Sequence, residues 1–439
     1  MTGPAQQRVR AAAAAVGVSA RVADRFGGMA ARGGVVLQDR GMSPARPSRR
    51  PRTLLGRLRV CLLVVVVALA VLFGGGGWYF AGQIRADGLA VERSAPAYDL
   101  TVVGVGAGTV TLHEASGHER DPALRRGEEY GLGWPGGSGV LGVVPAAGSD
   151  GAVVRPLTVS TGRAPRVGTR AELRRDVFND PASAYHRPVR DVGIACAGGQ
   201  CPAWYLPGTG ATWAVLVHGK GATRTEPLRA LGAVLQVGMP ALVVSYRNDP
   251  GAPRDPSGFY RYGATEWRDL DLAVRYALDH GARRVVLGGF SMGGGIVASF
   301  LEHSGRTASV SGLVLDAPML DFRRTVDFGA SQRRLPLVGA PIPGPLTWTA
   351  ETLAGLRYGI NWQCIDYLDA HWLRVPTLLF HGTADDTVPI ATSDGLARAH
   401  PDLVREVRVR GATHVGAWNA DPARYTAILA AFLRQLSAR

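Results

Sequence analysis

The sequence is short of lysine, of cysteine and, in one long segment, of charge. Lys220 is the only lysine in 439 residues, because the composition takes its cations from arginine. The four cysteines lack the paired spacing of a zinc site, so the sequence predicts no structural metal. No charged residue occurs from Val60 to Ile84, which makes that segment a candidate membrane span.

Positive charge is concentrated near the amino terminus and does not form a basic face. The chain has a formal net charge of +14. The first 59 residues contain twelve arginines and only two acidic residues, Asp24 and Asp39, so their net charge is +10. The other 380 residues therefore carry a net charge of only +4. This placement argues against a nucleic-acid partner. Residues 1–59 are predicted to be a disordered basic tail, within which Met29 or Met42 could be the true start.

Residues 60–84 are predicted to be a transmembrane helix. About 20 apolar residues cross 30 Å of hydrocarbon, and Trp78 and Tyr79 stand where an interfacial aromatic belt would lie. Arginines crowd the amino-terminal flank, so the positive-inside rule predicts a cytoplasmic amino terminus and an extracytoplasmic remainder.

A cleaved signal peptide is the alternative, since Ser48-Arg49-Arg50 resembles part of a twin-arginine signal. The small-residue pattern Ala68-Leu69-Ala70 lies inside the apolar run, however, which favours an uncleaved anchor. A buried core helix is disfavoured because the run has no polar face.

Residues 95–190 are predicted to form a small β-rich module. They are rich in glycine, valine and threonine, and strand patterns occur at 100–105, 109–112, 130–134 and 153–159. No recognisable chemistry falls in this part. The next two strands, at 192–196 and 201–206, read as a hairpin whose turn is flanked by Cys196 and Cys201. Outside the cell these two would form a disulfide; the alternative is two free thiols. Cys61 and Cys364 are expected to be inert.

The sequence around Ser291 has the pattern of a strand, a sharp turn and a helix. Gly289-Phe290-Ser291-Met292-Gly293 matches G-x-S-x-G, in which the serine takes strained backbone angles and Gly289 and Gly293 remove side chains that would collide. The hydroxyl then stands over the amino end of a helix, where negative charge is favoured. The alternative is a glycine-rich turn with an incidental serine.

A second glycine-rich loop follows the strand predicted at 212–217, as His218-Gly219-Lys220-Gly221. Acyl transfer needs two backbone amides to hold an oxyanion, and the candidates are the amides of Lys220 and Met292. His218 is expected to brace the loop. Strand and helix patterns alternate from 241 through the serine to 318, which predicts a parallel sheet. Residues 322–367 look irregular and would form a short lid; their apolar content indicates either an apolar substrate or ordinary packing.

An acid and a base are expected beyond the last two strands. Residues 375–380 precede His381-Gly382-Thr383-Ala384-Asp385-Asp386, and Asp385 is the preferred acid, with Asp316 and Asp386 as alternatives. The strand at 405–409 is followed by Gly411-Ala412-Thr413-His414 and then by a closing helix at 425–436. His414 is the predicted base; a solvated loop histidine is the alternative.

These four motifs resemble the α/β-hydrolase superfamily, and within it the prolyl-oligopeptidase-like and serine-aminopeptidase-like serine hydrolases. The resemblance covers residues 191–439 and implies a mostly parallel eight-stranded sheet flanked by helices. It also implies a catalytic triad of Ser291, His414 and Asp385, with an oxyanion hole at Lys220 and Met292. No metal or organic cofactor is implied. The chain lacks a β-propeller, so long-peptide specificity is unsupported.

The expected function is that of a membrane-anchored extracytoplasmic serine hydrolase acting on a small-molecule or lipid-like ester. The alternatives are a peptidase or an acyltransferase on the same triad, and a non-catalytic scaffold of the cell envelope.

Overall fold

The computed structural model describes residues 54–91, 96–115, 122–143, 146–147, 151–335 and 339–437. Most of the predicted basic tail, with Met29, Met42 and Ser48-Arg49-Arg50, lies outside the described residues. The chain divides into two units, Met1–Val67 and Ala68–Arg439. The described part of the first unit belongs to helix α2 (Leu54–Ala70), in which the apolar side chains from Leu58 to Val67 are exposed.

Helical backbone continues from α2 into the second unit. It passes through the π-helical turns η1 (Val71–Gly76), the helix α3 (Gly77–Gln83) and further π-helical turns, η2 (Ile84–Leu89). The stretch Gly56–Leu89 is 34 residues long, and by length and composition it could cross a membrane. It extends beyond the predicted span of 60–84 at both ends.

The carboxyl-terminal part of this helix belongs to the second unit and packs within it. Gly77, Ala81 and Leu89 are buried, and the neighbouring helix is α9 (Gly344–Tyr358). A β-carbon at Gly77 would lie 2.8 Å from Cγ2 of Thr349, so the glycine permits close contact between the two helices. The sequence analysis did not predict this contact.

The β-rich module is a small sheet that closes on itself. Its hydrogen-bonded order is β2-β1-β7-β3-β4-β6, and the long strand β6 pairs with both β4 and β2. The short strand β5 is paired along β6. Leu100, Val102, Leu112 and Leu132 are among the apolar residues that fill its interior. The strands are β1 (Leu100–Gly106), β2 (Thr109–Glu114), β3 (Tyr130–Trp134), β4 (Gly137–Leu141), β5 (Ala146–Ala147), β6 (Val153–Gly162) and β7 (Arg170–Arg174).

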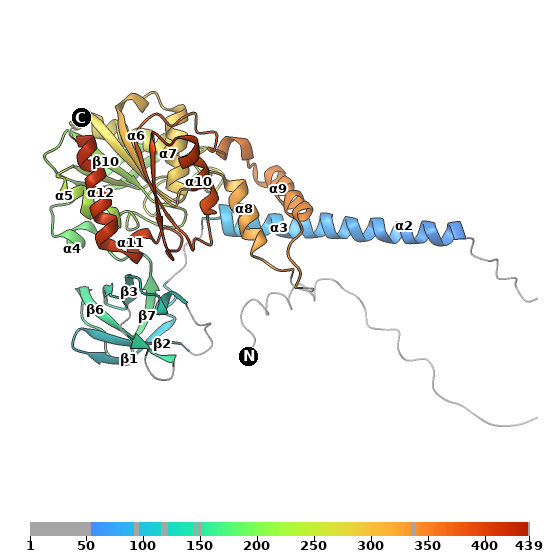
Figure 1. The fold of residues 1–439 in the computed structure, drawn as a ribbon, viewed down its shortest axis with the longest axis horizontal. Helices are drawn as coiled ribbons and strands as arrows, with labels where there is room; N and C mark the ends of the chain where they lie inside the picture. Colours follow the sequence, from blue (N-terminus) through green and yellow to red (C-terminus); the bar gives the residue numbers. More distant parts are fainter. Residues whose placement is uncertain are drawn as a thin grey trace, which may run out of the picture. The chain divides into compact units, whose positions relative to one another are not determined.

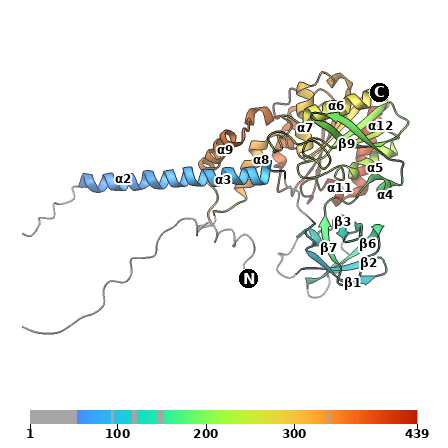
Figure 2. The ribbon, with the colours of Figure 1, turned by 180° about the vertical axis from the view of Figure 1, so that it is seen from behind.

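A second sheet of eight strands follows, in the order β15-β14-β13-β12-β10-β11-β9-β8. Figures 1 and 2 show this part of the chain from two opposite sides, with β10 labelled in the first view and β9 in the second. Neighbours from β15 to β11 are parallel, whereas β9 is antiparallel to β11 and β8 is antiparallel to β9. The mostly parallel eight-stranded sheet predicted from the sequence is therefore present. Its strands are β8 (Arg190–Cys196), β9 (Gly199–Leu206), β10 (Thr212–Val217), β11 (Ala241–Val244), β12 (Arg284–Phe290), β13 (Val310–Asp316), β14 (Thr377–Gly382) and β15 (Val404–Val409).

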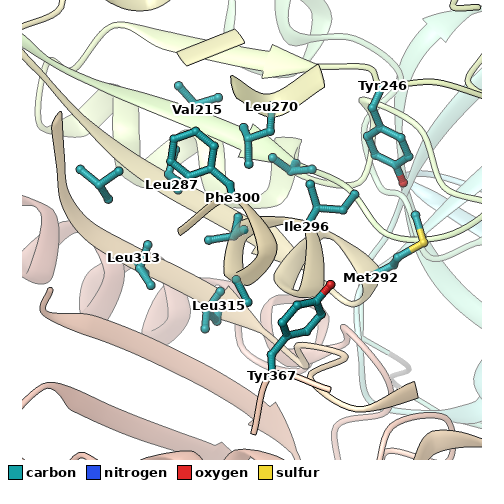
Figure 3. Packing of buried hydrophobic residues seen from close by; sticks show 14 of the residues in the cluster. Val215, Tyr246, Leu270, Leu287, Met292, Ile296, Phe300, Leu313, Leu315 and Tyr367 are labelled. Carbon is teal, nitrogen blue, oxygen red and sulfur yellow. The ribbon is translucent and has the colours of Figure 1, made fainter. Parts of the chain in front are cut away.

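Helices cover both faces of this sheet because its central strands are apolar on both sides. Alternate residues of β10 show the division: Val215 joins one core cluster, and Leu216 joins the other. The first cluster holds α6 (Trp267–Asp279) and α7 (Met292–His303), and the second holds α5 (Leu228–Gln236) and α12 (Pro422–Ser437). Figure 3 shows the first cluster, in which Phe300 and Ile296 of α7 lie among strand residues such as Leu287.

The predicted lid differs from the expectation in one respect. Residues 322–367 were expected to be irregular, but most of the described part is helical, with α8 (Phe322–Ser331), α9 and a short turn, η6 (Trp362–Ile365). Local capping explains both long helices. The side chain of Asp321 accepts a hydrogen bond from the Arg324 amide at the start of α8, and Gly359, with φ 66°, ends α9.

Candidate active site

Ser291 occupies the turn between β12 and α7. Its φ of 50° and ψ of −118° are strained for a residue with a side chain. The turn is held by hydrogen bonds from the Ser291 amide to the Asp316 carbonyl, at 3.0 Å, and from the Met319 amide to the Ser291 carbonyl, at 2.9 Å. The strain is thus supported by the neighbouring strand β13.

The two glycines of the motif are required by close backbone contacts. A β-carbon at Gly289 would lie 2.7 Å from the carbonyl oxygen of Gly293. One at Gly293 would lie 2.4 Å from the carbonyl oxygen of Val217, at the end of β10. A side chain at either position would push the helix, or the loop after β10, away from the serine.

The side chains of Ser291, His414 and Asp385 form one hydrogen-bonded chain. Nε2 of His414 lies 2.8 Å from Oγ of Ser291, and Nδ1 lies 2.8 Å from Oδ2 of Asp385. An ionised carboxylate only accepts, so Nδ1 carries the ring proton and Nε2 accepts the serine hydroxyl. The three residues come from the ends of β12, β14 and β15, and His414 is 8% exposed.

Asp385, and neither alternative carboxylate, is the partner of His414. Oδ1 of Asp385 accepts two backbone bonds, from Thr387 and Val388, each 2.8 Å long. Asp316 is buried at the end of β13, where burial raises its pKa to about 6 despite the charge of Arg229.

His381 on β14 supports the same carboxylate. Its Nε2 lies 3.2 Å from Oδ2 of Asp385 and 3.2 Å from the Val388 carbonyl, so that nitrogen carries a proton. Its Nδ1 contacts the hydroxyl of Ser393 at 2.7 Å. Burial alone would raise the pKa of Asp385, but the hydrogen bonds from His381 and His414 outweigh it and hold that pKa well below its usual range.

The loop after β10 lies beside the serine. A β-carbon at Gly219 would approach Cβ of Ser291 to 2.9 Å, and the Gly219 amide donates to Oε2 of Glu226 at 2.7 Å. Lys220 comes next, and it lines the same cavity as Ser291 and His414. Met292 is the first residue of α7, where helix amides lack intrahelical acceptors.

His218 is the brace that the sequence analysis expected. The ring is fully buried, and its Nε2 lies 2.7 Å from Oδ2 of Asp249, while its Nδ1 lies 2.9 Å from the Gly219 carbonyl. Burial lowers the pKa of His218, but the charge of Asp249 and the hydrogen bonds to Asp249 and Gly219 together outweigh it, so the net shift is upward. Its ring nitrogens are therefore engaged by the loop and by Asp249, as a bracing residue requires.

A cavity of about 410 Å³ opens beside Ser291, between the loops at the strand ends and the helices α3, α8 and α9. One wall, which includes Phe80, Gln83 and Ile84, comes from the long amino-terminal helix. Phe322, Val326 and Ala350 come from the lid helices. About half of the lining side chains are apolar, and the charged ones are Asp87, Lys220, Arg333 and Asp386.

Cys196 and Cys201 are joined by a disulfide across the β8–β9 hairpin, and Cys61 and Cys364 are free and exposed. Among the described residues, no group of three or more His, Cys, Asp or Glu could hold a metal ion.

Sequence reasoning missed three residues that build the site. His381 stood in a quoted motif but was given no role. Buried Arg229 on α5 and Asn419 on α11 (Ala417–Ala420) also went unnoticed, although Arg229 donates to the carbonyl of Val415, next to His414. An arginine within an otherwise apolar helix pattern was the available signal.

The strand order, with a serine after β12, a carboxylate after β14 and a histidine after β15, defines the α/β-hydrolase fold. No family model matches the sequence, and no curated protein sequence matches it significantly.

Three solved structures illustrate the likeness in fold. An esterase of Pyrococcus furiosus is 19% identical, with a TM-score of 0.46, over 60% of this chain and 96% of that one. A thermophilic esterase of Thermogutta terrifontis is 20% identical, with a TM-score of 0.40, over 56% of this chain and 99% of that one. A bromoperoxidase of Bacillus anthracis is also 20% identical, with a TM-score of 0.40, over 56% and 100% of the two chains. Likeness of this extent carries no information on substrate.

Proposed function

We propose that this chain is a membrane-anchored serine hydrolase that cleaves carboxylic esters through an acyl-enzyme. Ser291 is the nucleophile, His414 the general base and acid, and Asp385 the group that orients His414. The observation that carries the proposal is the pair of 2.8 Å hydrogen bonds that links the three side chains.

In the first step, Oγ of Ser291 forms a bond to the ester carbonyl carbon, and its proton passes to Nε2 of His414. Asp385 stabilises the imidazolium because its low pKa keeps it ionised. The carbon–oxygen bond to the alcohol then breaks as Nε2 returns the proton to that oxygen. Water then gives a proton to the same nitrogen as its oxygen bonds to the acyl carbon. The bond from that carbon to Oγ of Ser291 breaks as Nε2 returns the proton to Oγ, which releases the acid and restores the serine hydroxyl.

The oxyanion of the tetrahedral intermediate is assigned to the amides of Lys220 and Met292. Lys220 borders the cavity next to Ser291, and the amide of its neighbour Gly219 is already engaged by Glu226. Met292 opens α7, so the partial positive charge of the helix end adds to its amide.

The anchoring is assigned to the helix Gly56–Leu89, with the catalytic part outside the cytoplasm. Arginines on the amino-terminal side of the apolar run support this orientation. The Cys196–Cys201 disulfide is consistent with it, since disulfides persist in oxidising compartments.

The test uses the full chain in detergent, because Phe80 and Ile84 of the long helix line the cavity. The protein is incubated with a fluorophosphonate probe and, separately, with short p-nitrophenyl esters. We expect labelling and turnover, both abolished in Ser291→Ala. Ser311→Ala is the matched control, since this half-buried serine on β13 donates to the Val285 carbonyl and lies outside the site.

Equal labelling of wild type and Ser291→Ala would remove the serine-hydrolase proposal and leave a scaffold. Labelling of Ser291 without ester turnover would favour a peptidase or an acyltransferase on the same triad. These two activities are separated by their substrates. A peptidase would cleave short peptide amides, and an acyltransferase would transfer the acyl group of an ester to an added acceptor alcohol.

A further inference from the structure

We propose that the outward face of lid helix α9, together with the exposed aromatic side chains of α3, rests in the interfacial layer of the membrane that the anchor crosses. The cavity at Ser291 would then receive its substrate from that layer. This inference rests on the proposed function and narrows it to esters that carry a long apolar chain.

The outward face of α9 carries no charge. Trp348, Thr352 and Leu356 follow one another at four-residue spacing and are exposed, Trp348 to 64% and Leu356 to 80%. The charged residues of α9 are Glu351, which is buried, and Arg357, which is half-buried. A water-facing helix normally presents charged side chains on its outer face, so this face is suited to a less polar medium.

The position of α9 along the anchor places that face at the level of the membrane surface. About 20 helical residues cross the hydrocarbon, and counted from Val60 they end at Tyr79. α9 packs against that last turn: a β-carbon at Gly76 would lie 3.3 Å from Leu346, and one at Gly77 would lie 2.8 Å from Thr349. Helix α9 and the end of the proposed membrane span at Tyr79 therefore lie at the same depth in the membrane.

The side chains at this level are those of a membrane interface. Trp78 and Tyr79 are 56% and 53% exposed on α3. The guanidinium of Arg357 lies 3.3 Å from the ring centroid of Trp78 and donates to the Trp78 carbonyl at 3.2 Å. Tryptophan, tyrosine and arginine in this setting place apolar surface in the membrane and polar groups at the headgroups. Continuity with the apolar helix favours lipid over a second copy or another protein.

The same helices connect that surface to the catalytic serine. α9 lines the cavity through Thr347 and Ala350, one residue before Trp348 and two after it, and α3 lines it through Phe80, next to Tyr79. The cavity therefore lies directly behind the proposed membrane-facing surface. A long acyl or alkyl chain could pass from the membrane into these apolar walls while its ester carbonyl reaches Ser291.

Contact of α9 with lipid can be tested by a measurement that does not depend on enzyme activity. The full chain with Cys61→Ala and Cys364→Ser receives one new cysteine, either Thr352→Cys on α9 or, as the matched control, Arg275→Cys on α6, whose side chain is 60% exposed. Each variant is labelled with a fluorophore and reconstituted into phosphatidylcholine–phosphatidylglycerol vesicles that contain spin-labelled lipid. We expect quenching at position 352 and none at 275. No quenching at position 352 would overturn the inference. Protection of that label which depends only on protein concentration would overturn it too, because a second copy of the chain would then cover this face.

Substrate delivery is tested with Trp348→Asp combined with Leu356→Asp. These side chains do not line the cavity, so hydrolysis of p-nitrophenyl acetate should stay within about twofold of wild type. Hydrolysis of a long-chain ester embedded in vesicles should fall about tenfold or more, because the charges oppose insertion.

Val167→Asp, at an apolar residue 67% exposed in the β-rich module, is the control. Equal loss on both esters, or no loss on either, would contradict delivery from the membrane. A wild type inactive on both would remove the proposed function, while the quenching result would still decide the lipid contact.

Discussion

Nη1 of Arg229 lies 2.8 Å from the carbonyl oxygen of Val415 and donates a hydrogen bond to it. Val415 directly follows His414 and has a φ of 52°, a costly value for a β-branched residue. The same nitrogen lies 2.5 Å from Oδ1 of Asn419. The backbone that carries His414 is thus held by a buried cation on α5.

Replacement of Arg229 by methionine should lower kcat for ester hydrolysis by about tenfold or more while KM changes little. The reason is that the Val415 carbonyl loses its donor, at about 1–3 kcal/mol for a buried polar group, and the ring of His414 is less well held. Steady-state kinetics and thermal unfolding check this. Arg275→Met, which removes an exposed arginine from α6, is the control, and an Arg229→Met variant that loses stability but keeps its kcat would contradict the positioning role.

Loss of the His381 ring should affect Asp385 in a pH-dependent way. In His381→Phe the carboxylate loses one hydrogen-bond donor, so its pKa should rise and kcat should fall about tenfold. A lowered pKa stabilises the native state above the unfolded value of about 4 and loses that contribution as the pH falls. The variant's deficit in Tm should therefore be large at pH 7 and smaller near pH 3. His371→Phe, at a histidine 87% exposed, is the control; a deficit independent of pH would indicate lost packing alone.

The fold could be predicted from the sequence because its signals are local and aligned along the chain. The apolar strand at 284–290, the glycines around Ser291 and the loop at His414 each mark the end of one parallel strand, and parallel strands bring their carboxyl ends to one edge. The prediction that one carboxylate meets the histidine followed from that geometry. Asp385 could be preferred to Asp316 because it lies in a turn beyond its strand.

The parts that could not be predicted depend on long-range packing. The contact of Gly77 with Thr349 joins residues that are far apart in the sequence, and a glycine in an apolar helix gives no sign of its partner. The helices of the lid were missed for a related reason. Their cap residues, Asp321 and Gly359, are common in loops, and the prolines between α8 and α9 made the whole stretch look irregular.

Glu351 should make the stability of the lid depend on pH. Its side chain is 3% exposed, and burial together with the charge of Asp327 raises its pKa to about 8, although Arg323 lies 3.5 Å away. A carboxyl with a raised pKa stabilises the native state fully below its unfolded pKa, near 4, and loses that contribution as the pH rises towards 8. Between pH 5 and 8, Tm should therefore fall more in wild type than in Glu351→Gln, by roughly several degrees. Asp279→Asn, at an exposed carboxyl of α6, is the control; parallel Tm curves for wild type and Glu351→Gln would contradict the assignment.

The contact between the long amino-terminal helix and α9 can be tested by two leucines introduced into the same run of glycines. At Gly77 a β-carbon would lie 2.8 Å from Thr349 and 3.2 Å from Leu353, so Gly77→Leu must push α9 away from α3. At Gly74 nothing lies within 4 Å, so Gly74→Leu adds an apolar side chain without a clash.

We expect Gly77→Leu to lower the free energy of unfolding by about 1–3 kcal/mol, as overpacking does. It should also slow hydrolysis of long-chain esters, because Thr347 and Ala350 of α9 line the cavity. Gly74→Leu should leave both stability and activity near wild type. Thermal unfolding in detergent and ester kinetics measure the two effects, and equal behaviour of the two variants would show that the long amino-terminal helix does not shape the site.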